Sequence, residues 1–178
     1  MSNLDEKAMN DLFDRHLAAE FAERSSEQAV ATMGPHPHVN LVPLMTGGVG
    51  REQVKEFYAN QLLAQIPPDM KTTPISRTIG KERIVDEYVA HFTHSIQMDW
   101  LLPGVPPTGK YLEIPTVVIA HIQDGKIVSE HIYWDQASVL VQLGLIDRSL
   151  PARGAEIARQ VIQPTQPMNE LIHRARER

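Results

Sequence analysis

The fold of this chain is decided by residues 103–144, which read P-G-V-P-P-T-G-K-Y-L-E-I-P-T-V-V-I-A-H-I-Q-D-G-K-I-V-S-E-H-I-Y-W-D-Q-A-S-V-L-V-Q-L-G. Alternating apolar residues predict one strand over 111–122 and a second over 127–135, joined by a Q-D-G-K turn. The second strand ends in Asp135, directly before a helix predicted over 137–144. The end of a strand is a good place to hold a proton-transfer group, such as this carboxylate, against a ligand.

Amphipathic helices dominate the first part of the chain. Met9, Phe13, Leu17 and Phe21 recur at four-residue spacing and predict a helix over 4–24. The next predicted elements are a short helix (26–33), a Gly/Pro breaker (34–37), a strand (39–44), a flexible turn (46–50), a helix (51–65), strands (72–79 and 83–100) and a Pro/Gly loop (103–109). Helices followed by an antiparallel meander predict an α+β fold, with the helices covering one face of a curved sheet.

The C-terminal part reads as a separate tail over residues 147–178. Three prolines divide it, and its pattern predicts helices at 154–162 and 169–176. We expect this helical tail to pack on the domain or on a dimer partner.

Composition excludes several function classes. The 178 residues carry a formal net charge of -5 with no block of Lys or Arg, so we expect neither a nucleic-acid partner nor a membrane surface. The chain has no Cys, which excludes disulfides, thiolate metal sites and a Cys nucleophile. The N-terminus has no basic segment followed by an apolar one, so a cytoplasmic location is expected.

The order of elements, the P-P-T-G-K segment at 106–110 and the W-D pair followed by Q-L-G together resemble the SnoaL-like polyketide cyclase group of the nuclear transport factor 2-like superfamily. The order of the secondary-structure elements is similar over residues 5–146, and the similarity in residue type is specific over 103–144. The run E-H-I-Y-W-D-Q-A-S-V-L-V-Q-L-G-L, with P-A-R-G-A-E after it, is also similar to a domain found beside dienelactone hydrolases.

This resemblance implies a cone-shaped domain over residues 1–146, in which a bent sheet and helices enclose one apolar pocket. Enzymes of the superfamily include cyclases, isomerases, dehydratases and epoxide hydrolases, whereas other members only bind ligands or partners. In the cyclases a strand-end Asp acts as general acid/base, and Asp135 stands at the matching position. A His on the preceding strand accompanies it there, and His121 is placed similarly.

The turn between the two strands decides which side chains share a face. A two-residue Asp124-Gly125 loop would pair Gln123 with Lys126 and would place His121 and Asp135 on opposite faces. A three-residue loop with Gly125 in the left-handed conformation would pair Ile122 with Lys126 instead. His121, His131, Tyr133 and Asp135 would then share a face, and we favour this arrangement because Gln suits a tight primed turn poorly.

Each candidate site residue has a catalytic and a structural interpretation. Asp135 is predicted to be a general acid/base, assisted by His131, His94 or His121, but it could equally cap the following helix. His94 could equally be a core histidine. Tyr133, Trp100 and Tyr58 are predicted to contact the substrate, although such aromatic residues more often belong to the core.

Three further groups are interpreted as structural. His36 and His38 flank Pro37 and could join His94 or His131 in a metal site, but no Cys or clustered carboxylate supports this, so no metal or cofactor is expected. Glu130 lies on the face opposite to Asp135 and is interpreted as a salt-bridge or interface residue. Ile132 and Trp134 would suit an outer face that pairs in a homodimer.

The leading prediction is a cofactor-independent enzyme that transfers a proton on a small apolar carbonyl compound. Cyclisation, isomerisation and dehydration all fit this description. Two alternatives stay open at this stage: a non-catalytic domain that binds a small apolar ligand, and a protein-interaction domain with a filled core.

Overall fold

The computed structural model describes residues 5–147 and 149–176. In chain order the elements are α1 (Glu6–Leu17), the π-helix η1 (Ala18–Ala22), α2 (Ser26–Ala31), β1 (Met33–Leu41), β2 (Thr46–Val49), α3 (Arg51–Phe57), the π-helix η2 (Tyr58–Leu62), the 3-10 helix η3 (Leu63–Gln65), β3 (Lys71–Ile79), β4 (Arg83–Thr93), β5 (Tyr111–Gln123), β6 (Lys126–Trp134), α4 (Gln136–Leu143), α5 (Glu156–Ile162) and α6 (Glu170–Arg176). None of the helices in these described residues is long and apolar enough to cross a membrane.

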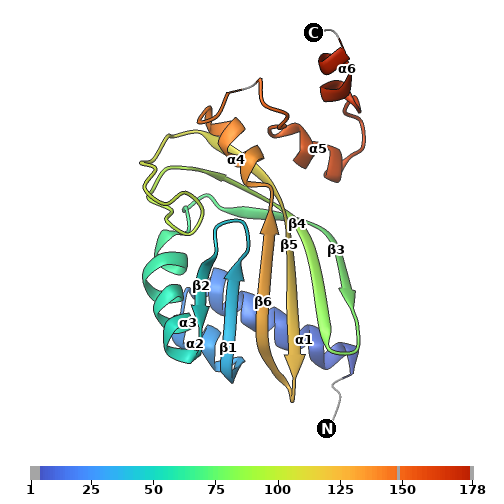
Figure 1. The fold of residues 1–178 in the computed structure, drawn as a ribbon. Helices are drawn as coiled ribbons and strands as arrows, with labels where there is room; N and C mark the ends of the chain where they lie inside the picture. The colour runs from blue at the N-terminus through green and yellow to red at the C-terminus, as the bar shows by residue number, and fades with distance from the viewer. Residues whose placement is uncertain (1–4, 148, 177–178) are drawn as a thin grey trace.

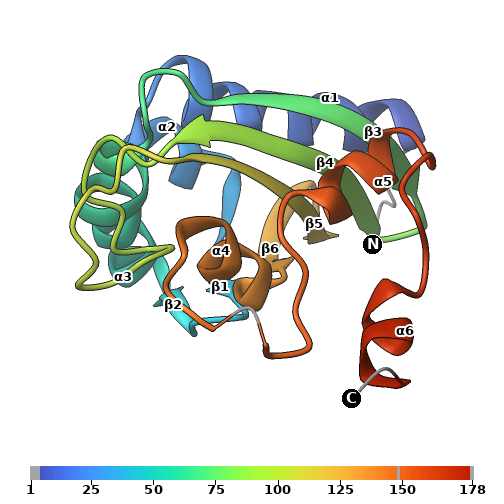
Figure 2. The same ribbon diagram turned by 90° about the horizontal axis from the view of Figure 1, so that it is seen from above.

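The six strands form one curved sheet in the order β2-β1-β6-β5-β4-β3. All neighbouring pairs are antiparallel except β1 and β6, which run parallel. In Figure 1, α1 crosses the sheet, and α2 and α3 lie beside β1 and β2; Figure 2 shows the curvature from above. The predicted α+β cone fold is therefore confirmed.

Polar contacts hold α1 over the sheet. The Arg77 guanidinium on β3 donates to Asp14 at 2.6 Å and to Asn10 at 2.7 Å, both on α1. The same group donates to Asp86 on β4 at 2.9 Å and lies 5.0 Å from the centroid of the Phe13 ring. These contacts tie α1 to the far edge of the sheet and so set where its buried side chains reach.

Two predicted irregular segments are strands. Residues 34–37 belong to β1. The register between β1 and β6 shifts between Met33 and His38, so Pro35 and Pro37 lie where the hydrogen-bond ladder is interrupted. The N–H groups that proline lacks matter least there. Residues 46–49 form β2. A Cβ at Gly47 would lie 2.0 Å from the Val39 carbonyl oxygen, so this glycine allows the close approach of two strands.

The strand predicted over 83–100 ends at Thr93. Beyond it the chain turns, with Leu101 and Leu102 both donating their N–H groups to the Met98 carbonyl. Period-two spacing of apolar residues continues through this segment, but the consecutive residues Leu101 and Leu102 are both buried, as they would not be in a strand with one covered face.

The C-terminal tail contacts the domain through α5. Ala158 is fully buried, Arg159 forms an ion pair with Glu113 of β5 at 2.7 Å, and the Ser138 hydroxyl of α4 donates to the Gly154 carbonyl at 3.1 Å. The helix α6 projects farther from the sheet (Figure 1).

Candidate active site

The β5–β6 hairpin does not close with the three-residue loop that the sequence favours. Gln123 pairs with Lys126, and both Asp124 and Gly125 have positive φ, at 50° and 72°. Positive φ at both central residues defines a two-residue primed turn. The backbone twist of this turn matches the twist of the flanking strands. The preference for a three-residue loop was therefore wrong.

A β-bulge farther along restores the predicted sharing of faces. Ile122 pairs with Ile127 but His121 pairs with Ser129, so β6 carries one extra residue, Val128. From this point the strands are paired so that His121, His131, Tyr133 and Asp135 share a face, as expected. The faces were thus divided correctly, but through a bulge in the strand rather than through the turn.

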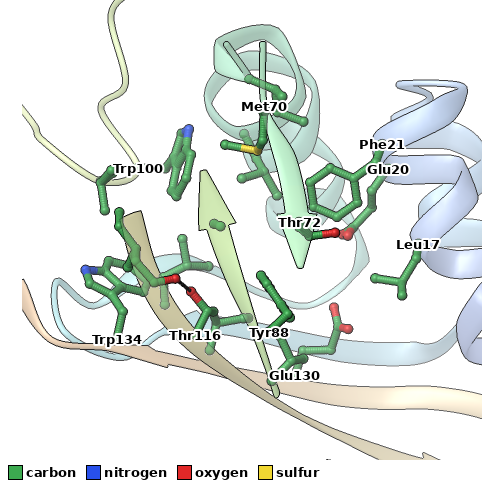
Figure 3. Close-up of a pocket in the computed structure, with 18 of the residues that line it drawn as sticks. Leu17, Glu20, Phe21, Met70, Thr72, Tyr88, Trp100, Thr116, Glu130 and Trp134 are labelled. Atoms are coloured by element: carbon green, nitrogen blue, oxygen red, sulfur yellow. Dashed lines mark hydrogen bonds between the residues drawn. The ribbon is translucent and has the colours of Figure 1, made fainter. Parts of the chain in front are cut away.

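The shared face is the outer face of the sheet. The pocket is lined instead by the alternate residues of the two strands: Ile114, Thr116 and Val118 of β5, and Glu130, Ile132 and Trp134 of β6 (Figure 3). Ile132 and Trp134 therefore face the pocket and not a dimer partner, which corrects the expected role of both. The homodimer itself stays a prediction.

Asp135 lies outside the pocket lining and is exposed to solvent. Its carboxylate accepts a hydrogen bond from the Ala137 backbone N–H at 2.9 Å and caps α4. His121 is half-buried on the outer face, where its Nε2 lies 3.8 Å from the Glu82 carboxylate. Tyr133 is 40% exposed on the same face. The geometry thus gives Asp135 the capping role, the alternative weighed from the sequence.

Three other predicted residues are divided between core and pocket. His94 is fully buried outside the pocket lining; its Nδ1 lies 3.2 Å from the Thr108 hydroxyl, and its Nε2 has no hydrogen-bond partner among the described residues. Burial lowers the pKa of His94. Trp100 and Tyr58 both line the pocket, where their rings lie near those of Trp134 and Phe57, respectively.

The pocket is a largely apolar cavity of about 90 Å³ between the end of α1, the π-helices η1 and η2, and the inner face of the sheet. One water molecule needs roughly 10–15 Å³ of such cavity volume, so the cavity has room for a small molecule. The lining includes aromatic and aliphatic side chains and a few polar groups, of which Glu20, Glu130, Tyr58 and Tyr88 can move protons or donate hydrogen bonds.

An acid–base cluster of His16, Glu20, Glu130 and Tyr58 lies against this cavity. The His16 Nε2 lies 3.2 Å from Glu20 Oε1 and 3.1 Å from Glu130 Oε2. The Tyr58 hydroxyl donates to the same Glu130 Oε2 at 3.0 Å. All four side chains are buried, at 0–9% exposure for the ionisable groups, so their mutual interactions are weakly screened by solvent.

The contacts of His16 determine its protonation. The Thr32 hydroxyl donates its proton to the Ala29 carbonyl at 2.6 Å, so it accepts from His16 Nδ1 at 2.7 Å. The His16 Nε2 faces two carboxylates, which accept when ionised. Burial lowers the pKa of His16, but the charges of Glu130 and Glu20 outweigh burial and raise the pKa well above its ordinary value. His16 is therefore an imidazolium at neutral pH.

The same contacts act on the partners of His16. Burial raises the pKa of Glu130, but the charge of His16 and the hydrogen bonds from His16 and Tyr58 outweigh it and hold the pKa below its ordinary value. Burial, with the charges of Glu130 and Glu20, raises the pKa of Tyr58 well above its ordinary value. Tyr58 is therefore a neutral donor.

Tyr88 supplies a second phenol to the pocket. Burial raises its pKa, and the negative charges of Glu20, Asp86 and Glu130 raise it further. No hydrogen bond joins its hydroxyl to another of the described residues, although the side chain lines the cavity (Figure 3). Tyr88 can therefore donate a hydrogen bond to an oxygen atom of a ligand.

Two π-helical turns supply groups to the cavity. Glu20 and Phe21 lie in η1, directly after α1, and Tyr58 and Leu62 lie in η2, directly after α3. Such turns hold one more residue than an α-helical turn and occur often at functional sites. The wider turn shifts the following side chains around the helix axis, and here both turns border the cavity.

Sequence reasoning missed His16 and Glu20, whereas Glu130, interpreted as a salt-bridge or interface residue, does form an ion pair, with His16. A signal was present in the helix predicted over 4–24, because His16 and Glu20 fall on the same stripe as Met9 and Phe13, at spacings of three or four residues. Polar residues in an apolar stripe call for partners, and Glu130 was the acidic residue that alternates with two apolar residues on its strand.

One atom from each of His16, Glu20 and Glu130 lies within 4.8 Å of the others, so these residues form a set that a metal ion could contact. The hydrogen bonds described above already use the His16 nitrogen and a Glu130 oxygen. These residues thus bond to one another as an acid–base cluster.

Comparison with known proteins agrees with this architecture. A family model for SnoaL-like polyketide cyclase matches residues 5–143. TsrD from Streptomyces laurentii is 17% identical with a TM-score of 0.63, covering 80% of this chain and 99% of its own. IdmH from Streptomyces antibioticus is 25% identical with a TM-score of 0.56, covering 76% and 97%.

The epoxide hydrolase/cyclase-like enzyme SalBIII, of pyran ring formation in polyether salinomycin, is 16% identical with a TM-score of 0.56, covering 74% of this chain and 93% of its own. Comparison with curated protein sequences gives no significant match. The sheet, the enclosing helices and the family match over most of the chain lead to one conclusion: the protein belongs to the SnoaL-like polyketide cyclase family, with the fold of the nuclear transport factor 2-like superfamily.

Proposed function

We propose that this protein is a cofactor-independent cyclase or isomerase that moves a proton next to the carbonyl group of a small, largely apolar compound. The observation that carries the proposal is the cluster of two carboxylates around one imidazolium at the wall of an apolar cavity. A low-dielectric cavity strengthens each of these electrostatic interactions and excludes competing water.

Glu20 is the proposed proton acceptor. Both hydrogen bonds to Glu130 from His16 and Tyr58 end on one oxygen, and its lowered pKa weakens it as a base. Glu20 contacts His16 at 3.2 Å and reaches the cavity from the first π-helical turn. Glu130 then serves as the counter-charge that keeps His16 protonated.

The proton movement follows from this assignment. Glu20 takes a proton from the carbon beside the carbonyl, and the electron pair moves onto the carbonyl oxygen as an enolate. The Tyr88 hydroxyl donates a hydrogen bond to that oxygen. In a cyclisation the enolate carbon attacks a second carbonyl, and the resulting alkoxide takes the proton back. In an isomerisation the same proton returns to another carbon.

The proposal is tested by proton exchange in a model ketone. We expect wild-type protein to accelerate the exchange of the α-protons of 2-tetralone into D2O, followed by NMR. Glu20→Gln should lower the protein-dependent rate by about 10²-fold or more, the usual contribution of general base catalysis. The matched control is Asp135→Asn, which changes a carboxylate outside the cavity and should keep the rate. Equal rates for Glu20→Gln and wild type, or loss of exchange in Asp135→Asn, would contradict the assignment.

A second candidate is a non-catalytic domain that holds a small apolar ligand. It is favoured by the predominance of apolar side chains in the lining and by the internal pairing of Glu130. In that case 2-tetralone would bind, as shown by shifts in the NMR signals of the protein, while its α-protons would exchange no faster than in buffer.

A further inference from the structure

The buried cluster at the wall of the cavity has the spacing of a metal site as well as that of an acid–base cluster. The His16 Nε2 lies 3.2 Å from Glu20 Oε1 and 3.1 Å from Glu130 Oε2, and one ligand atom from each residue lies within 4.8 Å of the others. Two atoms that bind one tetrahedral Zn²⁺ at roughly 2.0–2.2 Å lie about 3.3–3.5 Å apart. Both contacts of His16 are therefore within a few tenths of an ångström of this spacing.

Two hydrogen bonds from outside this triad hold its ligands in the orientation that a metal ion needs. The Thr32 hydroxyl donates to the Ala29 carbonyl at 2.6 Å, so it accepts from His16 Nδ1 at 2.7 Å. The imidazole therefore carries a proton on Nδ1 and directs Nε2 at the carboxylates. The Tyr58 hydroxyl donates to Glu130 at 3.0 Å and holds that carboxylate. Metal-binding histidines almost always donate their other ring N–H in this way, and the partners of the ligands orient the site.

The balance of charge also favours a divalent ion. With Glu20 and Glu130 ionised, the imidazolium of His16 offsets only one of two buried negative charges. A divalent ion bound to a neutral imidazole would offset both, and buried charges are found either paired or on metal ions. A ligand set of one imidazole and two carboxylates suits a transition-metal ion such as Zn²⁺, whereas Mg²⁺ takes oxygen ligands.

The cavity offers an entry route and a fourth ligand position. Glu20 and Glu130 both line it (Figure 3). Phe21 and Thr72 line it too and are exposed to solvent, so the cavity borders the surface beside Glu20. An ion can enter here and keep one water molecule on the side that faces the cavity.

We propose that His16, Glu20 and Glu130 bind one Zn²⁺ in place of the proton between them, with water in the fourth position. Three protein ligands and one open position form a recurring zinc coordination set. The ion would occupy the His16 Nε2 and the Glu20 carboxylate, so it would stop the proton transfer proposed above and not assist it. That effect on activity rests on the proposed function, whereas the binding of Zn²⁺ does not.

The test is isothermal titration calorimetry of Zn²⁺ into chelator-treated protein that carries no histidine tag. We expect one Zn²⁺ per chain for wild type and no saturable heat with Mg²⁺. Glu20→Gln and Glu130→Gln keep the size of the side chain and should each weaken Zn²⁺ binding by more than the roughly 10–100-fold that loss of an outer-shell partner costs. Thr32→Val removes such a partner and should weaken binding by about 10–100-fold. Cooperative urea unfolding shows that each variant is folded.

His131→Ala is the matched control. It breaks the contact between the His38 and His131 Nε2 atoms, 3.0 Å apart on the outer face of the sheet, and leaves the buried cluster intact, so it should bind Zn²⁺ as wild type does. Absence of saturable heat in wild type would overturn the site, and so would unchanged affinity in folded Glu20→Gln or Glu130→Gln. Loss of binding in His131→Ala with retention in Glu130→Gln would assign the ion to the outer face instead.

Activity separates this inference from the proposed function. Saturating Zn²⁺ should suppress the protein-dependent exchange of the α-protons of 2-tetralone, and a chelator should restore it. A wild-type protein that binds Zn²⁺ and exchanges no protons would contradict the proposed function and support the metal site. Proton exchange that depends on Glu20, without any binding of Zn²⁺, would support the proposed function and overturn the metal site.

Discussion

The two faces of β6 place histidine in opposite electrostatic surroundings. On the pocket face, Glu130 and Glu20 raise the pKa of the buried His16 well above its ordinary value. On the outer face, partial burial and the neighbouring charges of His131 and His121 lower the pKa of His38. One imidazole is therefore held charged and the other neutral on the two sides of a single sheet, and what surrounds the ring decides which.

The difference rests on a single extra residue. Val128 sets which alternate residues of β6 face the pocket, because a shift of one residue exchanges the two faces. Deleting Val128 should bring Glu130, Ile132 and Trp134 to the outer face and His131 and Tyr133 to the pocket. We expect this deletion to abolish the cooperative unfolding transition, measured by circular dichroism in urea.

The control for this deletion keeps the chain length. Val128→Ala retains the bulge and removes only part of a half-buried side chain, so it should cost about 1 kcal/mol or less. A deletion variant that unfolds cooperatively with near-normal stability would show that the bulge does not set the faces.

The pocket face should also be sensitive to the loss of its cation. His16→Ala would leave Glu20 and Glu130 buried without their shared partner, and breaking a buried ion pair costs about 3–5 kcal/mol. Urea unfolding at pH 7 measures the change, with His173→Ala as the matched exposed control. A loss below about 1 kcal/mol would mean that the cluster does not hold a charged imidazole.

The pH dependence of stability should have opposite signs for the two faces. The raised pKa of His16 means that its contribution is fully present below about pH 6.5 and is lost as the pH rises through the raised value. The lowered pKa of His38 means that folding is penalised as the pH falls below about 6.5, because the unfolded chain binds the proton first.

Unfolding free energies from pH 5 to 9, measured with chelator present, separate these two effects. His16→Gln should lose the decline on the alkaline side, and His38→Gln should lose the decline on the acid side. Glu130, with its lowered pKa, acts below about pH 4.3 and so leaves this window clear. Parallel curves for wild type and both variants would contradict the contrast between the faces.

The smallest expected effect is at the end of β6, where the chain leaves the sheet. Asp135→Ala removes the cap of α4 and should cost about 0.5–2 kcal/mol. Asp135→Asn keeps a capping oxygen and should cost less, which thermal unfolding of the two variants can compare. An Asp135→Asn variant as unstable as Asp135→Ala would show that its charge, and not the cap, is what matters.

The hairpin shows how much of this architecture can be read from sequence. Alternation located both strands, and the turn residues located the reversal, because these signals are local. Which face turns inward depends on the helices that cover the sheet, and alternation alone does not carry that information. His131 and Asp135 were therefore grouped correctly and assigned to the wrong side.

The candidate site was harder to predict than the fold. His16 and Glu130 are 114 residues apart in the chain and meet only because α1 crosses β6. Trp100 and Tyr58, predicted to contact a substrate, both line the pocket, since large aromatic side chains fill such interiors in most arrangements. The meeting of polar groups requires an exact crossing point, which propensity does not encode.

The two π-helical turns have a consequence for how such a pocket can arise during evolution. Each holds one residue more than an α-helical turn, and each carries a side chain of the acid–base cluster, Glu20 or Tyr58. Removal of one codon upstream would rotate such a side chain by about 100° around its helix, away from the cavity, with every chemical group still encoded. Within one family, short insertions and deletions in two helices can therefore switch a shared scaffold between an interior that holds such a polar cluster and one that does not.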